Sequence, residues 1–297
     1  MTDVAQRGRS YWSDAWRKLR RNRTAMACLF VVGFFSLIAI YGQARAWYYD
    51  AEDITAPYNV VDLEQQYLPP SFEHPMGTDN LGRDVLQRVI QGTTVAFQVG
   101  IITSLIAIPL GLFFGLIAGY FGGRVDDVIV WLYSTFASMP SLLFILALSL
   151  VVGKGLIGVF IGVGLTAWVN LCRLVRGEVM KHKDRAYVQA AQTLGIGHGR
   201  ILFRHILPNV LHLVIITFSL RFPAAIGTEV IVSFLGIGVQ GEPSWGVMIS
   251  NARLRLWEGI WWEMTFVTLA IFAIVLAFNL LGDALRDALD PKLAKQR

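Results

Sequence analysis

Cysteine and charge are both scarce in this chain of 297 residues, and each scarcity excludes a class of protein. The only cysteines are Cys28 and Cys172, which imply no disulfide framework and lack the clustered spacing of a metal site. Charged side chains make up 16% of the chain and hydrophobic ones 55%, and the mean hydropathy of +0.52 exceeds that of ordinary soluble domains. We therefore predict a membrane protein.

Motifs for catalysis and nucleotide binding are also missing. The chain has no phosphate-binding loop of the form G-x-x-x-x-G-K-[ST], no G-x-S-x-G nucleophile turn and no H-E-x-x-H zinc helix. Its five histidines form no recognisable ligand set. The stretch GIGVQG at 236–241 matches G-x-G-x-x-G only by letter, because no strand precedes it. We predict no catalytic residue and no metal site.

Six apolar stretches are long enough to cross a bilayer as helices, which takes about 20 residues each. Their continuous hydrophobicity favours helices over a barrel, whose strands alternate between lipid-facing and lumen-facing residues. We predict an all-α membrane protein with spans near 24–41, 95–120, 128–152, 156–175, 210–236 and 264–281.

The distribution of basic residues predicts the orientation, because Lys and Arg in short loops resist translocation. Most of the 26 Lys and Arg fall inside if both termini are cytoplasmic. The predicted organisation is a cytoplasmic N-terminal segment 1–23, a transmembrane domain 24–281 and a cytoplasmic tail 282–297. Within the transmembrane domain, the outer loops are 42–94 and 237–263, and the cytoplasmic loop is 176–209. The net charge of +5 therefore reflects topology and gives little support for nucleic-acid binding.

The first outer loop, 42–94, is acidic. This composition fits a solvated loop, and it also fits a surface that meets something outside the cell membrane. Asp79, Arg83 and Asp84 stand close together in the sequence. We expect them to form a paired, ordered turn.

The cytoplasmic loop contains a predicted short amphipathic helix followed by a turn. Apolar residues recur at helical spacing and make one stripe; they are Tyr187, Ala190, Ala191 and Leu194. Gly195 stands where a helix C-cap takes a left-handed conformation. A second short helix is predicted at 200–207, and Pro208 fits the first turn of the next membrane helix. The small-residue face suits a groove on a partner protein, but a helix resting on the membrane surface explains the pattern equally well.

The same loop resembles a family signature. Gln189-Ala190-Ala191, then Gly195 after three residues, then His205-Ile206-Leu207-Pro208 after nine more, closely resemble the EAA-type signature of permease subunits of bacterial ABC importers. Stretches 74–85, 229–250 and 282–292 resemble the C-type permeases of oligopeptide, dipeptide and nickel importers. Gln189 stands where the signature has Glu. This departure removes a charge but keeps a hydrogen-bonding side chain.

The resemblance implies the type I ABC importer permease fold in a bacterial inner membrane, and ATP-driven import of oligopeptides or dipeptides. In this family the motif forms a coupling helix that docks on a cytoplasmic ATPase. The docking residues implied here are Tyr187, Gln189, Ala190, Ala191, Leu194, Gly195, His205, Leu207 and Pro208. The expected partners are a homologous second permease, two ATPases that hold ATP and Mg²⁺, and an extracytoplasmic substrate-binding protein. This chain itself is expected to bind no cofactor.

Two alternatives to peptide import stay open. The first is a nickel or other small-solute importer of the same family. The second belongs to a different class: a membrane scaffold or receptor whose cytoplasmic loop binds a signalling partner.

Two charges in or beside the fifth span are candidates for the translocation path. Charge is costly within a membrane and usually faces a partner or a water-filled cavity. Arg221 and Glu229 are eight residues apart, so they lie roughly on one face of a helix. The alternative is that Pro223 breaks the helix and both charges serve a structural turn.

Proline and glycine also predict features of individual spans. Pro140 predicts a kink in the third span. Small residues at close to helical spacing along the second span predict close helix packing, within this chain or against a second permease; they are Gly100, Gly111, Gly115 and Gly119.

Overall fold

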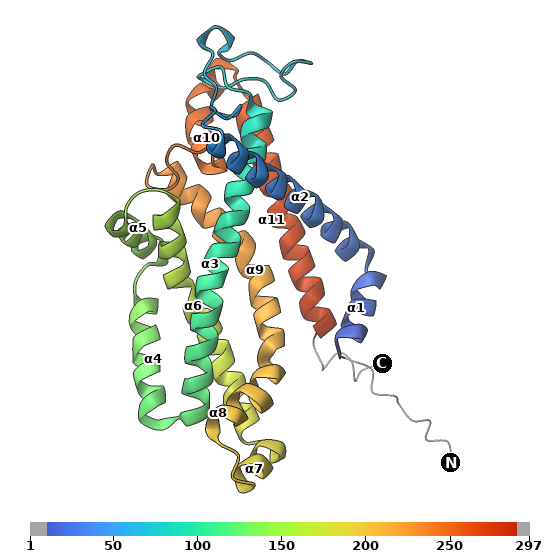
Figure 1. Ribbon diagram of the computed structural model, residues 1–297, viewed down its shortest axis with the longest axis vertical. Helices are drawn as coiled ribbons and strands as arrows, with labels where there is room; N and C mark the ends of the chain where they lie inside the picture. The colour runs from blue at the N-terminus through green and yellow to red at the C-terminus, as the bar shows by residue number, and fades with distance from the viewer. Residues whose placement is uncertain (1–10, 290–297) are drawn as a thin grey trace.

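The computed structural model describes residues 11–289 as a long bundle of helices (Figure 1). Over this range the chain forms no strand beyond one isolated bridge between Thr78 and Asp84. The helical elements in chain order are α1 (Tyr11–Arg21), α2 (Arg23–Ala51), η1 (Leu63–Gln65), α3 (Val85–Phe121), α4 (Gly123–Ser138), α5 (Ser141–Val152), α6 (Leu156–Lys183), α7 (Ala186–Thr193), α8 (His198–Arg200), η2 (Ile201–Ile206), α9 (Leu207–Phe234), α10 (Trp245–Ala252), η3 (Arg253–Glu258) and α11 (Trp262–Leu289). Parts of the predicted terminal segments, residues 1–10 and 290–297, lie outside the described residues.

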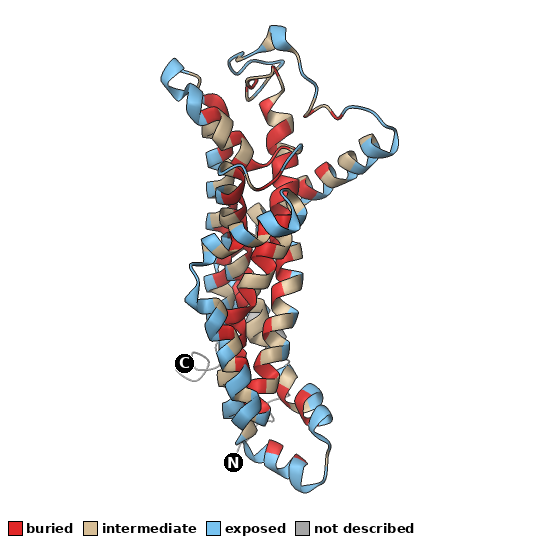
Figure 2. Ribbon diagram, turned by 90° about the vertical axis from the view of Figure 1, so that its left-hand side faces the viewer, coloured by how far each residue is buried: buried red, intermediate tan, exposed pale blue. Residues whose placement is uncertain are grey.

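The number of apolar helices agrees with the predicted all-α membrane protein. Within the described residues, five helices are long and apolar enough to cross a membrane, and a sixth span is completed if α4 and α5 count as one. Large apolar side chains point outward along α2, where Phe30 is 76% exposed. In Figure 2 the buried residues follow the contacts between helices, whereas the outward faces are exposed. Such outward apolar faces suit a bilayer as solvent.

The third predicted span is not one straight helix. It is broken between α4 and α5, whose axes differ by 92°. Met139 precedes a proline and takes an extended conformation with ψ 139°, as the proline ring requires. Pro140 then has no N–H to continue the helical hydrogen bonds. The kink predicted at Pro140 is therefore a complete break.

Helix α3 lies at the centre of the bundle and packs against α2, α6 and α9. Three of its small residues face α6; they are Gly111, Gly115 and Gly119. A Cβ atom at Gly115 would lie 2.7 Å from the Cβ of Val175, so only glycine permits this approach. Gly100 meets Phe222 of α9 in the same way. The predicted close packing is confirmed, and these glycines pack within this chain.

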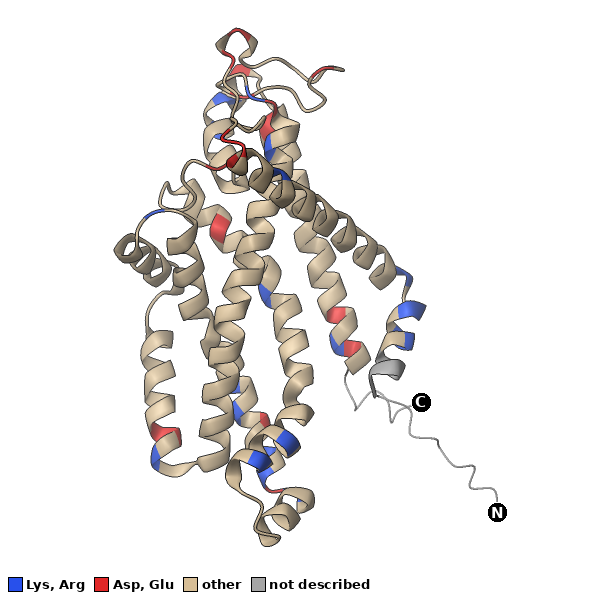
Figure 3. Cartoon of the chain, in the orientation of Figure 1, with Lys and Arg blue, Asp and Glu red and all other residues tan. Residues whose placement is uncertain are grey.

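The loop predicted as cytoplasmic and the loops predicted as outer lie at opposite ends of the bundle. Figure 1 places α7 and α8 at one end, and α10 with the loop after α2 at the other. Most basic side chains lie near α7 or on α1, whereas the loop after α2 is rich in acidic side chains (Figure 3).

An ordered turn precedes α3, as the sequence predicts. The Asp79 carboxylate accepts a hydrogen bond from the Arg83 Nε at 2.8 Å, and it lies 3.3 Å from the Arg88 Nε. Asp84 caps α3 by accepting the Gln87 N–H at 2.9 Å, and its other oxygen lies 2.9 Å from His74 Nδ1. Asp79 is only 1% exposed, so this turn is part of the buried structure.

Candidate functional site

Helix α7 projects at the end of the bundle between α6 and α8 (Figure 1). It ends at Gly195, whose φ of 73° lies in the left-handed region predicted for it. The Gly195 N–H donates to the Gln192 carbonyl at 2.9 Å, and the Ile196 N–H donates to the Ala191 carbonyl at 3.1 Å. These bonds satisfy carbonyl groups that the end of a helix leaves open.

The two sides of α7 have different surroundings. Val188 and Ala191 are 0% and 5% exposed and pack in a cluster that includes Val179 of α6. Tyr187 and Leu194 are exposed, Leu194 to 79%, and so is Ala190. We call Tyr187, Ala190 and Leu194 the open face of α7.

The predicted single stripe is therefore wrong in one respect. Ala191 belongs to the buried side, together with Val188, which lies outside the predicted stripe. The spacing of three residues between Val188 and Ala191 was a signal for a second apolar face. The burial of this second face holds α7 against the bundle, and the open face stays uncovered in this chain.

Two hydrogen bonds, each between a tyrosine hydroxyl and a histidine ring nitrogen, connect the cytoplasmic loop to the long helices. The Tyr187 hydroxyl lies 2.8 Å from Nδ1 of His182 in α6. The Tyr120 hydroxyl, at the end of α3, lies 2.8 Å from Nδ1 of His198 in α8. Partial burial raises the pKa of Tyr187, which keeps its phenol neutral. Both ends of the loop are thereby fixed relative to the long helices.

Gln189 occupies the position where the signature has Glu. Its side chain is exposed, and its Nε2 donates one long hydrogen bond of 3.4 Å to the Asp184 carbonyl. The side chain therefore stands at the surface next to the open face. We predict that Gln189 contacts the ATPase through a hydrogen bond, since its amide carries no charge for an ion pair.

The separate second helix predicted at 200–207 is wrong. α8, η2 and α9 form one continuous helical stretch from His198 to Phe234, with a π-helical segment in η2. The Leu207 N–H donates to the Leu202 carbonyl five residues back. Pro208 has no N–H for the usual bond to residue 204, so the wider π turn accommodates it. His205 and Leu207 are half-buried, and Pro208 is exposed in the first turn of α9.

Arg221 and Glu229 lie on α9 but have different partners. Helix α9 continues through Pro223, so the predicted alternative of a break there is wrong. Arg221 is partly exposed and donates to the backbone carbonyl of Ala167 in α6. Glu229 is fully buried and accepts a 2.7 Å hydrogen bond from Ser233. A role for either in the translocation path stays a prediction, and the partly exposed Arg221 is the stronger candidate.

The described part of the chain contains two cavities and no cluster of metal-binding side chains. No group of three or more His, Cys, Asp or Glu among residues 11–289 is placed to hold a metal ion. A largely apolar groove of 950 Å³ lies between α2, α3, α9 and α11, and a polar cavity of 460 Å³ lies near the outer end of α2. Neither is lined by Arg221 or Glu229.

Solved structures share this fold. The chain matches an inward-facing structure of the MetNI methionine ABC transporter with a TM-score of 0.51 and 16% identity, covering 69% of this chain and 96% of that chain. It matches an amino acid ABC transporter solved with histidines at a TM-score of 0.52 and 15% identity, covering 67% and 92%. At such low identity the comparison shows the fold alone, which is that of an ABC transporter permease.

The sequence comparisons give the particular family. Residues 111–295 match the family described as binding-protein-dependent transport system inner membrane component, and residues 10–70 match the N-terminal TM domain of oligopeptide transport permease C. The chain belongs to this family of inner membrane components, as a permease of the C type.

Curated relatives cover nearly the whole chain. The dipeptide transport system permease protein DppC of Bacillus subtilis is 39% identical over 96% of this chain and 87% of its own length. The oligopeptide permease OppC of the same organism is 36% identical over 98% and 93%. The glutathione permease GsiD of Pectobacterium atrosepticum is 37% identical over 96% and 92%.

These findings confirm the predicted C-type permease of a bacterial ABC importer with the type I permease fold. ATP hydrolysis in such systems belongs to separate subunits, so this chain is a transport component and not an enzyme.

Proposed function

We propose that this chain is one of two homologous permeases in an importer that moves short peptides across the bacterial inner membrane. Two ATPases with ATP and Mg²⁺ act at its cytoplasmic face, and an extracytoplasmic binding protein delivers the peptide. The support for peptides is that relatives at 36–39% identity are named for dipeptides, oligopeptides and glutathione. In this proposal the loop 176–209 and both termini lie in the cytoplasm.

The observation that carries the proposal is the open face of α7. Contiguous exposed apolar patches mark interaction sites, and the open face joins Tyr187, Ala190 and Leu194, of which Leu194 is 79% exposed. The opposite side of α7 is buried, and hydrogen bonds hold both ends of its loop to the bundle. An apolar face on a firmly held short helix suits a groove in a partner and transmits a push or pull to α3, α6 and α9.

This arrangement supports a mechanism of alternating access. Closing of the two ATPases around ATP draws their two docked helices together. Because α7 is joined to α6 and, through η2, directly to α9, its displacement turns the spans that follow it. The chemical energy is therefore used at a distance from this chain, which needs no catalytic group of its own.

Docking is tested by placing a charge on the open face. We expect Leu194→Glu to release the ATPases when the complex is purified through a tag on this chain. Leu254→Glu is the matched control, because Leu254 is also an exposed leucine, 67% exposed in η3 near the opposite end. Equal retention of the ATPases by the two variants would count against docking at α7.

The substrate is tested by uptake. A strain without this gene should lose accumulation of labelled di-, tri- and pentapeptides and regain it from a plasmid copy. Nickel accumulation should be unchanged. Loss of nickel uptake with normal peptide uptake would instead support the small-solute importer, and no change in either would support a receptor or scaffold.

A further inference from the structure

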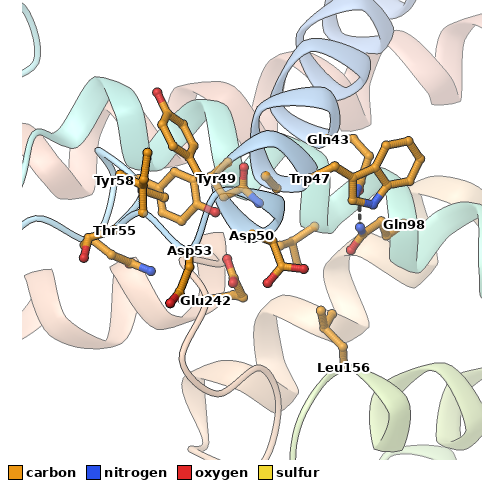
Figure 4. A pocket seen from close by; sticks show the side chains of 16 residues that line it. Gln43, Trp47, Tyr49, Asp50, Asp53, Thr55, Tyr58, Gln98, Leu156 and Glu242 are labelled. Carbon is orange, nitrogen blue, oxygen red and sulfur yellow. Dashed lines mark hydrogen bonds between the residues drawn. The ribbon is translucent and has the colours of Figure 1, made fainter.

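The polar cavity of 460 Å³ lies near the outer end of α2, where that helix passes into the first outer loop (Figure 4). Its walls come from α2 and the loop that follows it, from α3, from the first residue of α6, and from the segment that joins α9 to α10. Three acidic residues line it, Asp50, Asp53 and Glu242, and in Figure 4 their carboxylates point toward the same space. No Lys or Arg is among the described residues that line the cavity.

A buried amide without a partner also faces this cavity. Gln91 of α3 lines it, is only 5% exposed, and makes no side-chain hydrogen bond with any other described residue. Neither of its amide atoms is among the fully buried polar atoms that lack a partner, so the amide remains accessible from the cavity. The side-chain carbonyl of Gln91 is thus available to accept a hydrogen bond from a bound group.

Glu242 has one carboxylate oxygen without a hydrogen-bond partner. Its Oε2 is buried and has no hydrogen-bond partner among the described residues. Burial raises the pKa of Glu242; Arg88 lowers it and Asp50 raises it. Burial, with Glu242 next in effect, also raises the pKa of Tyr58 to about 12, so this phenol stays neutral beside the carboxylates.

The nearest basic side chains are engaged elsewhere. The Arg45 guanidinium lies over the rings of Tyr41 and Tyr49, at 5.3 and 5.8 Å from their centroids. Arg88 donates to the Tyr58 carbonyl at 3.1 Å and lies 3.3 Å from the carboxylate of Asp79. Among the described residues, neither arginine therefore forms an ion pair with Asp50, Asp53 or Glu242, although Arg88 still lowers the pKa of Glu242.

We infer that this cavity is a binding site for an organic ammonium group. Carboxylates neutralise such a cation, the Gln91 carbonyl accepts a hydrogen bond from one of its N–H groups, and the indole ring of Trp47, which also lines the cavity, attracts its charge. The acidic residues do not form a compact group that could hold a metal ion, which favours a larger cation. The amino terminus of a peptide carries this group, and this identification of the carrier rests on the proposed function.

The site is tested with a cysteine placed in the wall of the cavity. A negatively charged cavity should make this cysteine react faster with a cationic thiol reagent than with an anionic one. Thr55 lines the cavity and is exposed, and both native cysteines are buried, so Thr55→Cys gives a single reactive thiol. In the intact complex, the rates of modification by a trimethylammonium and by a sulfonate methanethiosulfonate are compared. We expect their ratio at Thr55→Cys to exceed that at Val60→Cys, an exposed position of the same loop outside the cavity.

Neutralising one carboxylate of the cavity should reduce the preference for the cationic reagent. Glu242→Gln and, separately, Asp50→Asn should each lower the ratio at Thr55→Cys about tenfold, because one unit charge about 6 Å away in water changes the rate of each reagent about threefold and in opposite directions. Glu52→Gln is the matched control, because Glu52 is exposed at the end of α2 but does not line the cavity. Equal ratios for the cavity variants and the control would overturn the inference.

A second experiment distinguishes a binding site for an ammonium group from a merely acidic surface. Ethylammonium at millimolar concentration should slow the reaction of Thr55→Cys with uncharged methyl methanethiosulfonate, but not that of Val60→Cys. Gln91→Leu should weaken this protection. Absence of protection in the unmodified cavity would overturn the inference. Neither arm depends on import, so failed peptide uptake would reject the proposed function alone, and failed protection with normal uptake would reject this site alone.

Discussion

Replacing Gly195 by valine isolates the contribution of one backbone conformation to the docking helix. Gly195 has a φ of 73°, and a Cβ atom added there would meet nothing within 4 Å. The effect of Gly195→Val is therefore a backbone effect with no steric clash against other residues. A left-handed conformation costs a residue with a side chain about 1–2 kcal/mol, which lowers the equilibrium constant for the capped end of α7 by roughly fivefold to thirtyfold.

The assay is peptide-stimulated ATP hydrolysis by the reconstituted complex. We expect Gly195→Val to lower the stimulated rate, by up to about thirtyfold, while the amount of chain inserted in the membrane stays unchanged. Gly197→Val is the matched control: a Cβ atom there also meets nothing within 4 Å, but its φ of −63° and ψ of 146° suit a β-branched residue. If both variants hydrolyse ATP at the same stimulated rate, the conformation of Gly195 does not control coupling.

Three further predictions concern orientation, packing and a buried charge. In intact cells, an impermeant thiol reagent should modify Phe72→Cys, fully exposed in the first outer loop, and spare Gly199→Cys beside α7; the reverse would overturn the orientation. Gly115→Leu should destabilise the chain by about 1–3 kcal/mol in thermal denaturation because α6 leaves no room for a side chain, and Gly177→Leu, which meets open space, should not. Glu229→Ala should reduce assembly, as measured by the yield of intact complex, whereas Glu229→Gln should keep the Ser233 hydrogen bond; reduced uptake at normal yield would favour a role in the path.

The spans and the family were predictable because each rests on a local property of the sequence. A bilayer accepts only backbone whose hydrogen bonds are satisfied, so a long apolar run is enough to predict a helix. The C-cap at Gly195 follows from the same local chemistry, since glycine there accepts a positive φ. The signature around Gln189 likewise lies within one short segment.

Features that depend on packing were predicted less well. Which residues of α7 are buried is decided by the contact with α6 and η2, so Val188 was missed and Ala191 was given to the wrong face. Pro140 predicts an interruption, but the angle of 92° is set by how α5 packs against α6. The wall of the outer cavity joins Asp50, Gln91 and Glu242, which no periodicity of the sequence connects.

The central claim is that another protein's ATP hydrolysis acts on this chain through α7, and a photo-crosslinker at position 194 tests it most directly. In native membranes, irradiation of the Leu194 variant should give one adduct with the mass of this chain plus the ATPase. The same crosslinker at position 254 should not give that adduct. An adduct with lipid alone at position 194 would show that α7 rests on the membrane surface and would contradict the account.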